Sequence, residues 1–143
     1  LIKNSRNHFH SISNFILIAA LLLVSCNEKN ARPATSMDTA RCFIESSLKG
    51  DFKTAEPLLL KNQSNQEWYK TFEAFYNKLS PEQKEKYKNT NYQINSFNEV
   101  NDTLCFLNFS NDYINKPMDM RLVKTSNEWF VDFSYSYQVN KIQ

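Results

Sequence analysis

Histidines, glycines and cysteines limit the chemistry open to this sequence. Both histidines, His8 and His10, lie among the first ten residues, so residues 27–143 contain none. This excludes a Ser-His or Cys-His catalytic pair, a histidine general base and histidine metal ligands from that part of the chain. The sequence has a single glycine and no CxxC pair. We therefore expect no phosphate-binding glycine loop, no dinucleotide fingerprint and no zinc site, and hence no cofactor and no metal.

One carboxylate remains as a candidate for catalysis. Asp132 is the only acidic residue in the aromatic-rich segment 129–137. An isomerase-like mechanism can work without histidine when a buried carboxylate is the base and a tyrosine hydroxyl donates a hydrogen bond. The donors would be Tyr76, Tyr135 or Tyr137. The alternative, which we favour, is that Asp132 is a cap or an ion-pair partner and that the tyrosines are packing residues.

Aromatic side chains make up 14% of the chain. They can line an apolar cleft for a lipid, a sterol-like molecule or a sugar. They can also simply fill the core of a small domain, and we expect this of most of them. As candidate ligand-binding residues we take Tyr69, Tyr76 and Tyr135.

Residues 1–25 are typical of a targeting segment. Lys3 and Arg6 are followed by the unbroken apolar run Phe15–Val24, which is about half the length of a membrane-spanning helix of about 20 residues. The run ends in Leu23-Val24-Ser25-Cys26, which resembles the lipobox of bacterial lipoproteins. The resemblance implies that Cys26 carries diacylglycerol as a thioether and becomes the membrane-anchored first residue of the mature protein. The alternative is a secreted protein with a cysteine near its cleavage site.

Residues 26–35 are expected to be the lipidated cysteine and a tether, because they show no apolar periodicity, and residues 36–143 a single domain. Without residues 1–25 the chain has fifteen lysines and arginines and fifteen aspartates and glutamates. A neutral domain offers no electrostatic attraction for nucleic acid, which needs a basic face.

Two further cysteines, Cys42 and Cys105, would lie in an oxidising compartment, where a disulfide has to be considered. Cys42 falls opposite the apolar face of its predicted helix, whereas Cys105 lies in the middle of a predicted strand. These positions favour two free thiols over a disulfide.

Helical periodicity marks the first half of the domain. Thr35, with Asp38 three residues later, predicts a helix that starts at Ser36, and the only glycine, Gly50, predicts its end. Further helices are predicted after the cap Asp51, across the apolar positions of 68–79, and after the capping sequence Ser80-Pro81-Glu82-Gln83.

After about residue 90 the apolar pattern alternates, which predicts strands. The predicted strands begin at Tyr92, run from Thr103 to Ser110, open at Pro117 and follow the turn Ser126-Asn127. We expect the last strand to continue to Tyr137, because alternate residues share one face: Trp129, Val131, Phe133, Tyr135 and Tyr137. Helices followed by strands predict an α+β fold, with N-terminal helices packed on a curved antiparallel sheet of about four strands.

This order of elements resembles the nuclear-transport-factor-2-like fold, also called the cystatin-like α+β cone, over residues 36–137. Leu48-Lys49-Gly50-Asp51-Phe52 resembles the junction between the family's first two helices. Asn127-Glu128-Trp129-Phe130-Val131-Asp132-Phe133 resembles its last hairpin, and Leu79–Lys84 resembles small lipoproteins of this fold from gram-negative bacteria. The resemblance implies a curved sheet that wraps a helix around a conical pocket.

Relatives of this kind are either isomerase-like and cyclase-like enzymes or modules for binding and dimerisation, so the fold does not decide the function. We expect a non-enzymatic binding module anchored in the cell envelope through Cys26, at the periplasmic face or at the outer-membrane surface. Its partner would be a small apolar ligand or an envelope protein. The alternatives are a histidine-free isomerase-like or cyclase-like enzyme, and a structural homodimer.

Overall fold

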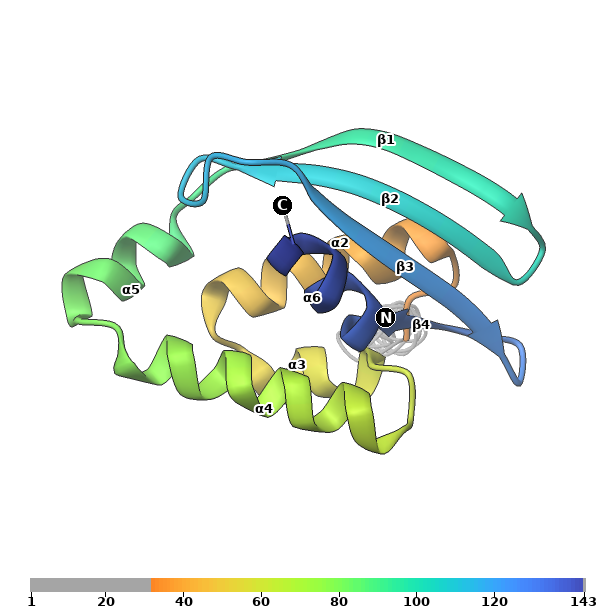
Figure 1. Cartoon of the computed structure of the whole chain (residues 1–143), viewed down its shortest axis with the longest axis horizontal. Coiled ribbons are helices and arrows are strands. Elements are labelled where there is room, and N and C mark those ends of the chain that lie inside the picture. The colour runs from red at the N-terminus through yellow and green to blue at the C-terminus, as the bar shows by residue number, and fades with distance from the viewer. Residues whose placement is uncertain (1–31, 143) are drawn as a thin grey trace, which may run out of the picture. The chain divides into compact units, whose positions relative to one another are not determined.

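The computed structural model describes residues 32–142, which form an α+β domain (Figure 1). Residues 32–143 cluster into one compact unit, and a unit with its own core is expected to fold by itself. The predicted targeting segment, Cys26 and the tether as far as residue 31 lie outside the described residues. The elements are α2 (Ser36–Lys49), α3 (Phe52–Ala55), the 3-10 turn η3 (Glu56–Leu58), α4 (Gln63–Lys78), α5 (Pro81–Lys88), β1 (Tyr92–Asn101), β2 (Leu104–Asn111), β3 (Met118–Thr125), β4 (Glu128–Asp132) and α6 (Phe133–Ile142).

The predicted ends of helix α2 are confirmed. The Thr35 hydroxyl accepts the Asp38 backbone N–H at 3.1 Å, which caps the start of the helix. Gly50 ends it in the left-handed conformation, with φ of 70°. A Cβ at Gly50 would lie 2.5 Å from the Tyr76 ring. Both backbone conformation and space therefore require glycine at this position.

The predicted caps at Asp51 and Ser80 are confirmed as well, whereas the helix expected across residues 68–79 begins earlier, at Gln63. The Asp51 carboxylate accepts the Thr54 N–H at 3.2 Å and caps the short helix α3. Ser80 and Gln83 form both hydrogen bonds of a capping box at the start of α5. These bonds join residues three apart in the sequence, which is why a sequence pattern can predict them.

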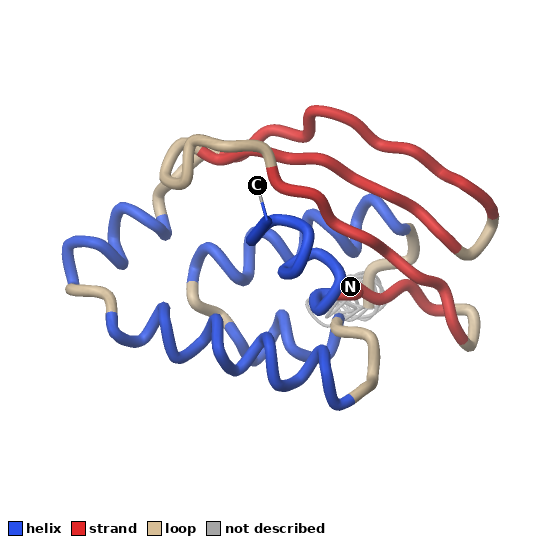
Figure 2. The backbone as a smooth tube through the Cα atoms, viewed as in Figure 1, coloured by secondary structure: helices blue, strands red, loops and turns tan. Residues whose placement is uncertain are grey.

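The four strands form an open antiparallel sheet in the order β1-β2-β3-β4, and helices gather on one side of it (Figure 2). Cys105 of β2, Leu122 of β3 and Val131 of β4 are paired neighbours across the sheet and are all fully buried. Leu59 forms a parallel bridge with Val131, so the segment after η3 covers part of the outer edge of β4. The core lies between this face and the helices, above all α2.

The prediction that the last strand continues to Tyr137 is wrong. Strand β4 ends at Asp132, and the chain then forms helix α6, so the helices are not all N-terminal to the sheet. The Asp132 carboxylate accepts the Tyr135 backbone N–H at 3.3 Å and the Ser134 hydroxyl at 3.0 Å, which caps the new helix. The alternating aromatic pattern also fits a helix, because Phe133 and Tyr137 are four residues apart and share a helical face.

Helix α6 takes the place of a strand beside the first half of β3. The Ser136 hydroxyl accepts the backbone N–H of Arg121 at 3.2 Å. The Asn140 side chain accepts the N–H of Asp119 at 2.7 Å and donates to its carbonyl at 2.9 Å. Two side chains one helical turn apart thus satisfy alternate backbone groups of β3, as a neighbouring strand would.

Candidate functional site

A pocket of about 320 Å³ lies between helix α2, strands β2 and β3, and helix α6. Its apolar lining consists of Phe43, Ile44, Leu48, Phe72, Phe109, Ile114, Met118, Met120 and Phe133. Its polar or amphipathic lining consists of Ser47, Tyr87, Asn111, Asp119, Ser136, Tyr137 and Asn140. A mainly apolar cavity with a few hydrogen-bonding groups is the usual form of a small-molecule site.

Helical spacing brings the lining residues of α2 and α6 to the pocket. Phe43 and Ser47 of α2 are four residues apart, as are Ile44 and Leu48. In α6, lining residues fall at positions i, i+3, i+4 and i+7, namely Phe133, Ser136, Tyr137 and Asn140. Such spacing places side chains on one helical face. The pocket therefore depends on residues 133–140 being helical.

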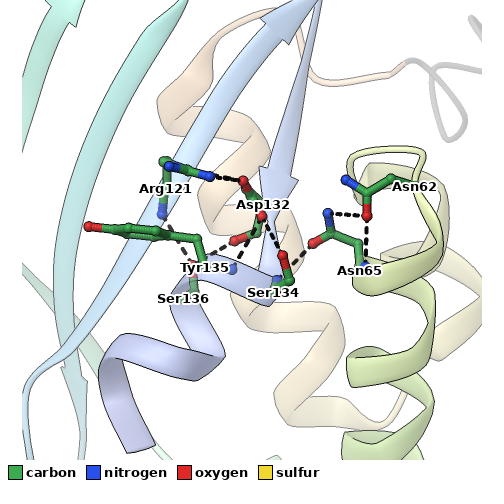
Figure 3. A network of polar contacts seen from close by, with 7 residues as sticks. All are labelled: Asn62, Asn65, Arg121, Asp132, Ser134, Tyr135 and Ser136. Atoms are coloured by element: carbon green, nitrogen blue, oxygen red, sulfur yellow. Dashed lines mark hydrogen bonds and ion pairs between the residues drawn. The ribbon is translucent and has the colours of Figure 1, made fainter. Parts of the chain in front are cut away.

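A polar network holds the start of helix α6 (Figure 3). Arg121 donates from Nε to Asp132 Oδ2 at 3.0 Å, and its Nη2 donates to the same oxygen. The fully buried Asn65 of α4 accepts the Ser134 backbone N–H at 2.8 Å, and its amide also donates to Asn62 at 2.9 Å. The first turn of α6 is thus tied to both β3 and α4. The sequence analysis missed Asn65, because no local pattern connects it to a residue 69 positions away.

Asp132 is placed as an ion-pair partner and helix cap rather than in the pocket. It does not line the cavity. Burial alone would raise its pKa, but hydrogen bonds from Arg121, the Tyr135 backbone and Ser134 together lower the pKa of Asp132 below its ordinary value. A general base at neutral pH needs the opposite shift.

The three tyrosines predicted to bind a ligand lie outside the pocket lining. Tyr69 and Tyr76 of α4 both pack against Phe52, whereas Tyr135 lies on α6. Tyr69 is buried and its hydroxyl is 3.0 Å from that of Ser47. Tyr76 is buried at the Gly50 turn. The Arg121 guanidinium lies over the Tyr135 ring, 4.1 Å from the centre of that ring. Arg121 of β3 lies opposite Phe106 of β2 in the strand register, and the Phe106 side chain faces away from the core.

Tyr137, the third donor considered for Asp132, does line the pocket and stacks on Trp68 with ring centres 4.5 Å apart. The polar lining residues Asn111 and Asn140 were missed by the sequence analysis. For Asn140 the i, i+3, i+4, i+7 spacing from Phe133 is a usable signal, provided that the segment is first recognised as a helix.

Cys42 and Cys105 are both free thiols. Cys105 is fully buried, and burial raises the pKa of its thiol. Cys42 is half-buried and packs against the core, so its expected position opposite the apolar face of α2 is wrong. Within residues 32–142 no group of three or more His, Cys, Asp or Glu side chains could hold a metal ion.

Arg32, the first residue that the structure describes, is held against the rest of the domain by several contacts. Arg32 donates to the backbone carbonyls of Pro57 and Trp129, each at 3.2 Å, and its guanidinium lies 4.3 Å from the centre of the Phe130 ring. Its Nε is 3.5 Å from a Glu128 carboxylate oxygen. The compact unit therefore begins at Arg32, whereas the sequence analysis began the domain at Ser36.

No family model, curated protein or solved structure matches the chain. Among the described helices, none has the length and apolar character needed to cross a membrane.

Proposed function

We propose that this chain is a lipid-anchored binding protein that holds a small, mainly apolar ligand between helices α2 and α6. The observation that carries the proposal is the pocket of about 320 Å³, lined by nine apolar residues and seven polar or amphipathic ones. This volume lies at the lower end of the range of about 300–1,000 Å³ for small-molecule sites. The proposal therefore concerns a compact ligand rather than a long acyl chain.

A nuclear-transport-factor-2-like fold is part of the same proposal. Its support is the order of helices and then four antiparallel strands, together with a pocket between α2 and the sheet. Helix α6 is the feature that the resemblance did not lead us to expect, and it forms one wall of that pocket.

Binding without catalysis is favoured over the isomerase-like or cyclase-like alternative. The candidate base, Asp132, does not line the pocket, and its lowered pKa suits an ion-pair partner. Asp119 is the one carboxylate among the described lining residues, and its Oδ1 accepts a hydrogen bond from Asn108 at 2.7 Å.

The binding site can be tested with two matched variants of residues 32–143. Ile114 lines the pocket and is 37% exposed, whereas Val100 is 51% exposed and lies outside the lining. We expect native mass spectrometry of protein purified from the host to show a reproducible small-molecule adduct. Ile114→Asp should abolish the adduct, because a carboxylate at the pocket is costly to desolvate, and Val100→Asp should keep it.

An adduct on both variants would place the ligand elsewhere. A ligand-free protein that copurifies as a dimer or with an envelope protein would overturn the proposal in favour of an interaction module. The membrane anchor has its own test in the full chain. Cys26→Ala should move the protein from the detergent phase to the aqueous phase, and a variant that still partitions into detergent would contradict the lipid attachment.

A further inference from the structure

The amide of Asn111 offers a hydrogen-bond donor to the pocket. Asn111 lines the cavity and is only 4% exposed. Its Oδ1 accepts the backbone N–H groups of Tyr113 at 3.1 Å and of Ile114 at 2.8 Å. These two bonds fix the orientation of the amide, since only the oxygen can accept them. The Nδ2 donor has no hydrogen-bond partner among the described residues and is not fully enclosed, so it remains open to a molecule in the pocket.

A second polar residue of the lining is linked to Asn111 through Tyr113. Tyr87 lines the cavity, is 4% exposed, and its hydroxyl has no hydrogen-bond partner within residues 32–142. Its ring packs against that of Tyr113 with centres 4.7 Å apart, and Tyr113 is the residue whose N–H Asn111 accepts. Burial raises the pKa of Tyr87 to about 12, so its hydroxyl is neutral at physiological pH.

The charge of the lining determines what these two groups can bind. No lysine or arginine is present among the described residues that line the pocket. The one lining residue with a carboxylate, Asp119, turns it to the outer face of the sheet, where it accepts a hydrogen bond from Asn108. An anionic ligand would lose its hydration without gaining a counter-charge. A neutral oxygen can accept a hydrogen bond from the Asn111 donor without that cost.

We infer that the ligand is a neutral, mainly apolar molecule with one carbonyl or hydroxyl oxygen, which accepts a hydrogen bond from Asn111 Nδ2 beside the Tyr87 hydroxyl. This inference rests on the proposed function, because it names the ligand class for the same pocket. The rest of the ligand contacts the apolar lining, including Phe43, Met120 and Phe133.

Three probes with the same ring system test this inference on residues 32–143. 2-Acetylnaphthalene carries a neutral acceptor, 2-ethylnaphthalene carries none, and 2-naphthoate is anionic. We expect the acetyl compound to bind about three- to tenfold more tightly than the ethyl compound, as one additional hydrogen bond implies. We expect 2-naphthoate to bind most weakly. Calorimetric titration or ring fluorescence measures all three.

Asn111→Asp is the decisive variant, because it keeps an oxygen for the Tyr113 and Ile114 N–H groups and replaces the donor with a carboxylate oxygen. The added charge weakens the binding of both neutral probes, so the quantity compared is the ratio of their affinities. The variant should abolish the preference for the acetyl compound over the ethyl compound. Tyr87→Phe should reduce this preference by a few fold. Tyr92→Phe is the control and should leave it unchanged, because the Tyr92 hydroxyl donates to Glu45 and does not line the pocket.

The outcomes separate this inference from the proposed function. Equal binding of the acetyl and ethyl compounds to the unchanged protein would overturn the assigned oxygen contact and leave the apolar pocket standing. Tightest binding of 2-naphthoate would overturn the neutral character of the ligand. If none of the three bound, both the pocket and the inference drawn from it would fail. These comparisons use the unchanged protein, so they hold even if Asn111→Asp does not fold.

Discussion

The side chain of Asn140 forms hydrogen bonds with both backbone groups of Asp119. Its oxygen accepts the Asp119 N–H at 2.7 Å, and its amide donates to the Asp119 carbonyl at 2.9 Å. An amide side chain on a helix thereby reproduces the hydrogen-bond pattern of a neighbouring strand. Exposed strand edges otherwise recruit other strands and promote aggregation. The pairing thus protects the edge of β3 while it holds helix α6 against the pocket.

Asn140→Ala should destabilise the domain by about 1–3 kcal/mol, because it removes two hydrogen bonds to partly buried backbone groups of Asp119. Amide hydrogen exchange of Asp119 should become faster than that of the β2 residues. Gln138→Ala is the control, since Gln138 is exposed on the same helix. Unchanged exchange at Asp119 in Asn140→Ala would contradict the edge-capping role of this side chain.

Asp132→Asn should change how stability depends on pH. The pKa of Asp132 is lowered in the folded protein, so the folded state favours its ionised form. This stabilisation is present above the ordinary aspartate pKa of about 4 and is lost as the pH falls through the lower folded value. Urea unfolding between pH 3 and pH 7 should show a smaller loss of stability on acidification in Asp132→Asn than in the unchanged protein.

The control for this pH series is Asp102→Asn, at an exposed position. It should follow the unchanged protein across the whole pH range. At pH 7 Asp132→Asn should itself be less stable by about 1–3 kcal/mol, because Arg121 loses a charged partner but is about one third exposed and keeps access to water. Parallel pH curves for all three proteins would show that Asp132 contributes nothing to the pH dependence.

Gly50→Ala should destabilise the domain by about 2 kcal/mol or more. The left-handed conformation costs about 1–2 kcal/mol for a residue with a Cβ, and that Cβ would also clash with the Tyr76 ring. In a double-mutant cycle with Tyr76→Ala, the two losses should add up to more than the loss in the double variant, because truncation of the ring removes the clash. Strict additivity would contradict close contact between these two residues.

We expect alkylation of residues 32–143 to depend on whether the protein is folded. In the folded, unreduced protein Cys105 should resist alkylation, because it is fully buried and its pKa is raised by burial. In denaturant without reductant both Cys42 and Cys105 should be labelled, as mass spectrometry would show. A denatured protein with no labelled cysteine would instead demonstrate a disulfide.

The sequence alone determined the elements whose signals are local. Thr35, Gly50 and Ser80 mark helix ends through bonds to residues three or four positions away. The Ser126-Asn127 turn has positive φ at both residues, as the tight hairpin turn between β3 and β4 requires. From such signals the helices before the sheet and the first three strands follow, with errors at their ends, whereas β4 ends at Asp132 instead of the predicted Tyr137.

Tertiary structure decided the segment 133–142 and, with it, the pocket. The alternating aromatic residues there fit a strand or a helix. Bonds from Asn65 to Ser134 and from Asn140 to Asp119, which join residues 69 and 21 positions apart, accompany the helical outcome. The pocket likewise combines α2, β2, β3 and α6. A periodic pattern indicates only which residues share a face of one helix or strand. A cavity, in contrast, depends on how elements that are distant in the sequence pack together. Asn111 and Asn140 could therefore be assigned to the site only from the fold.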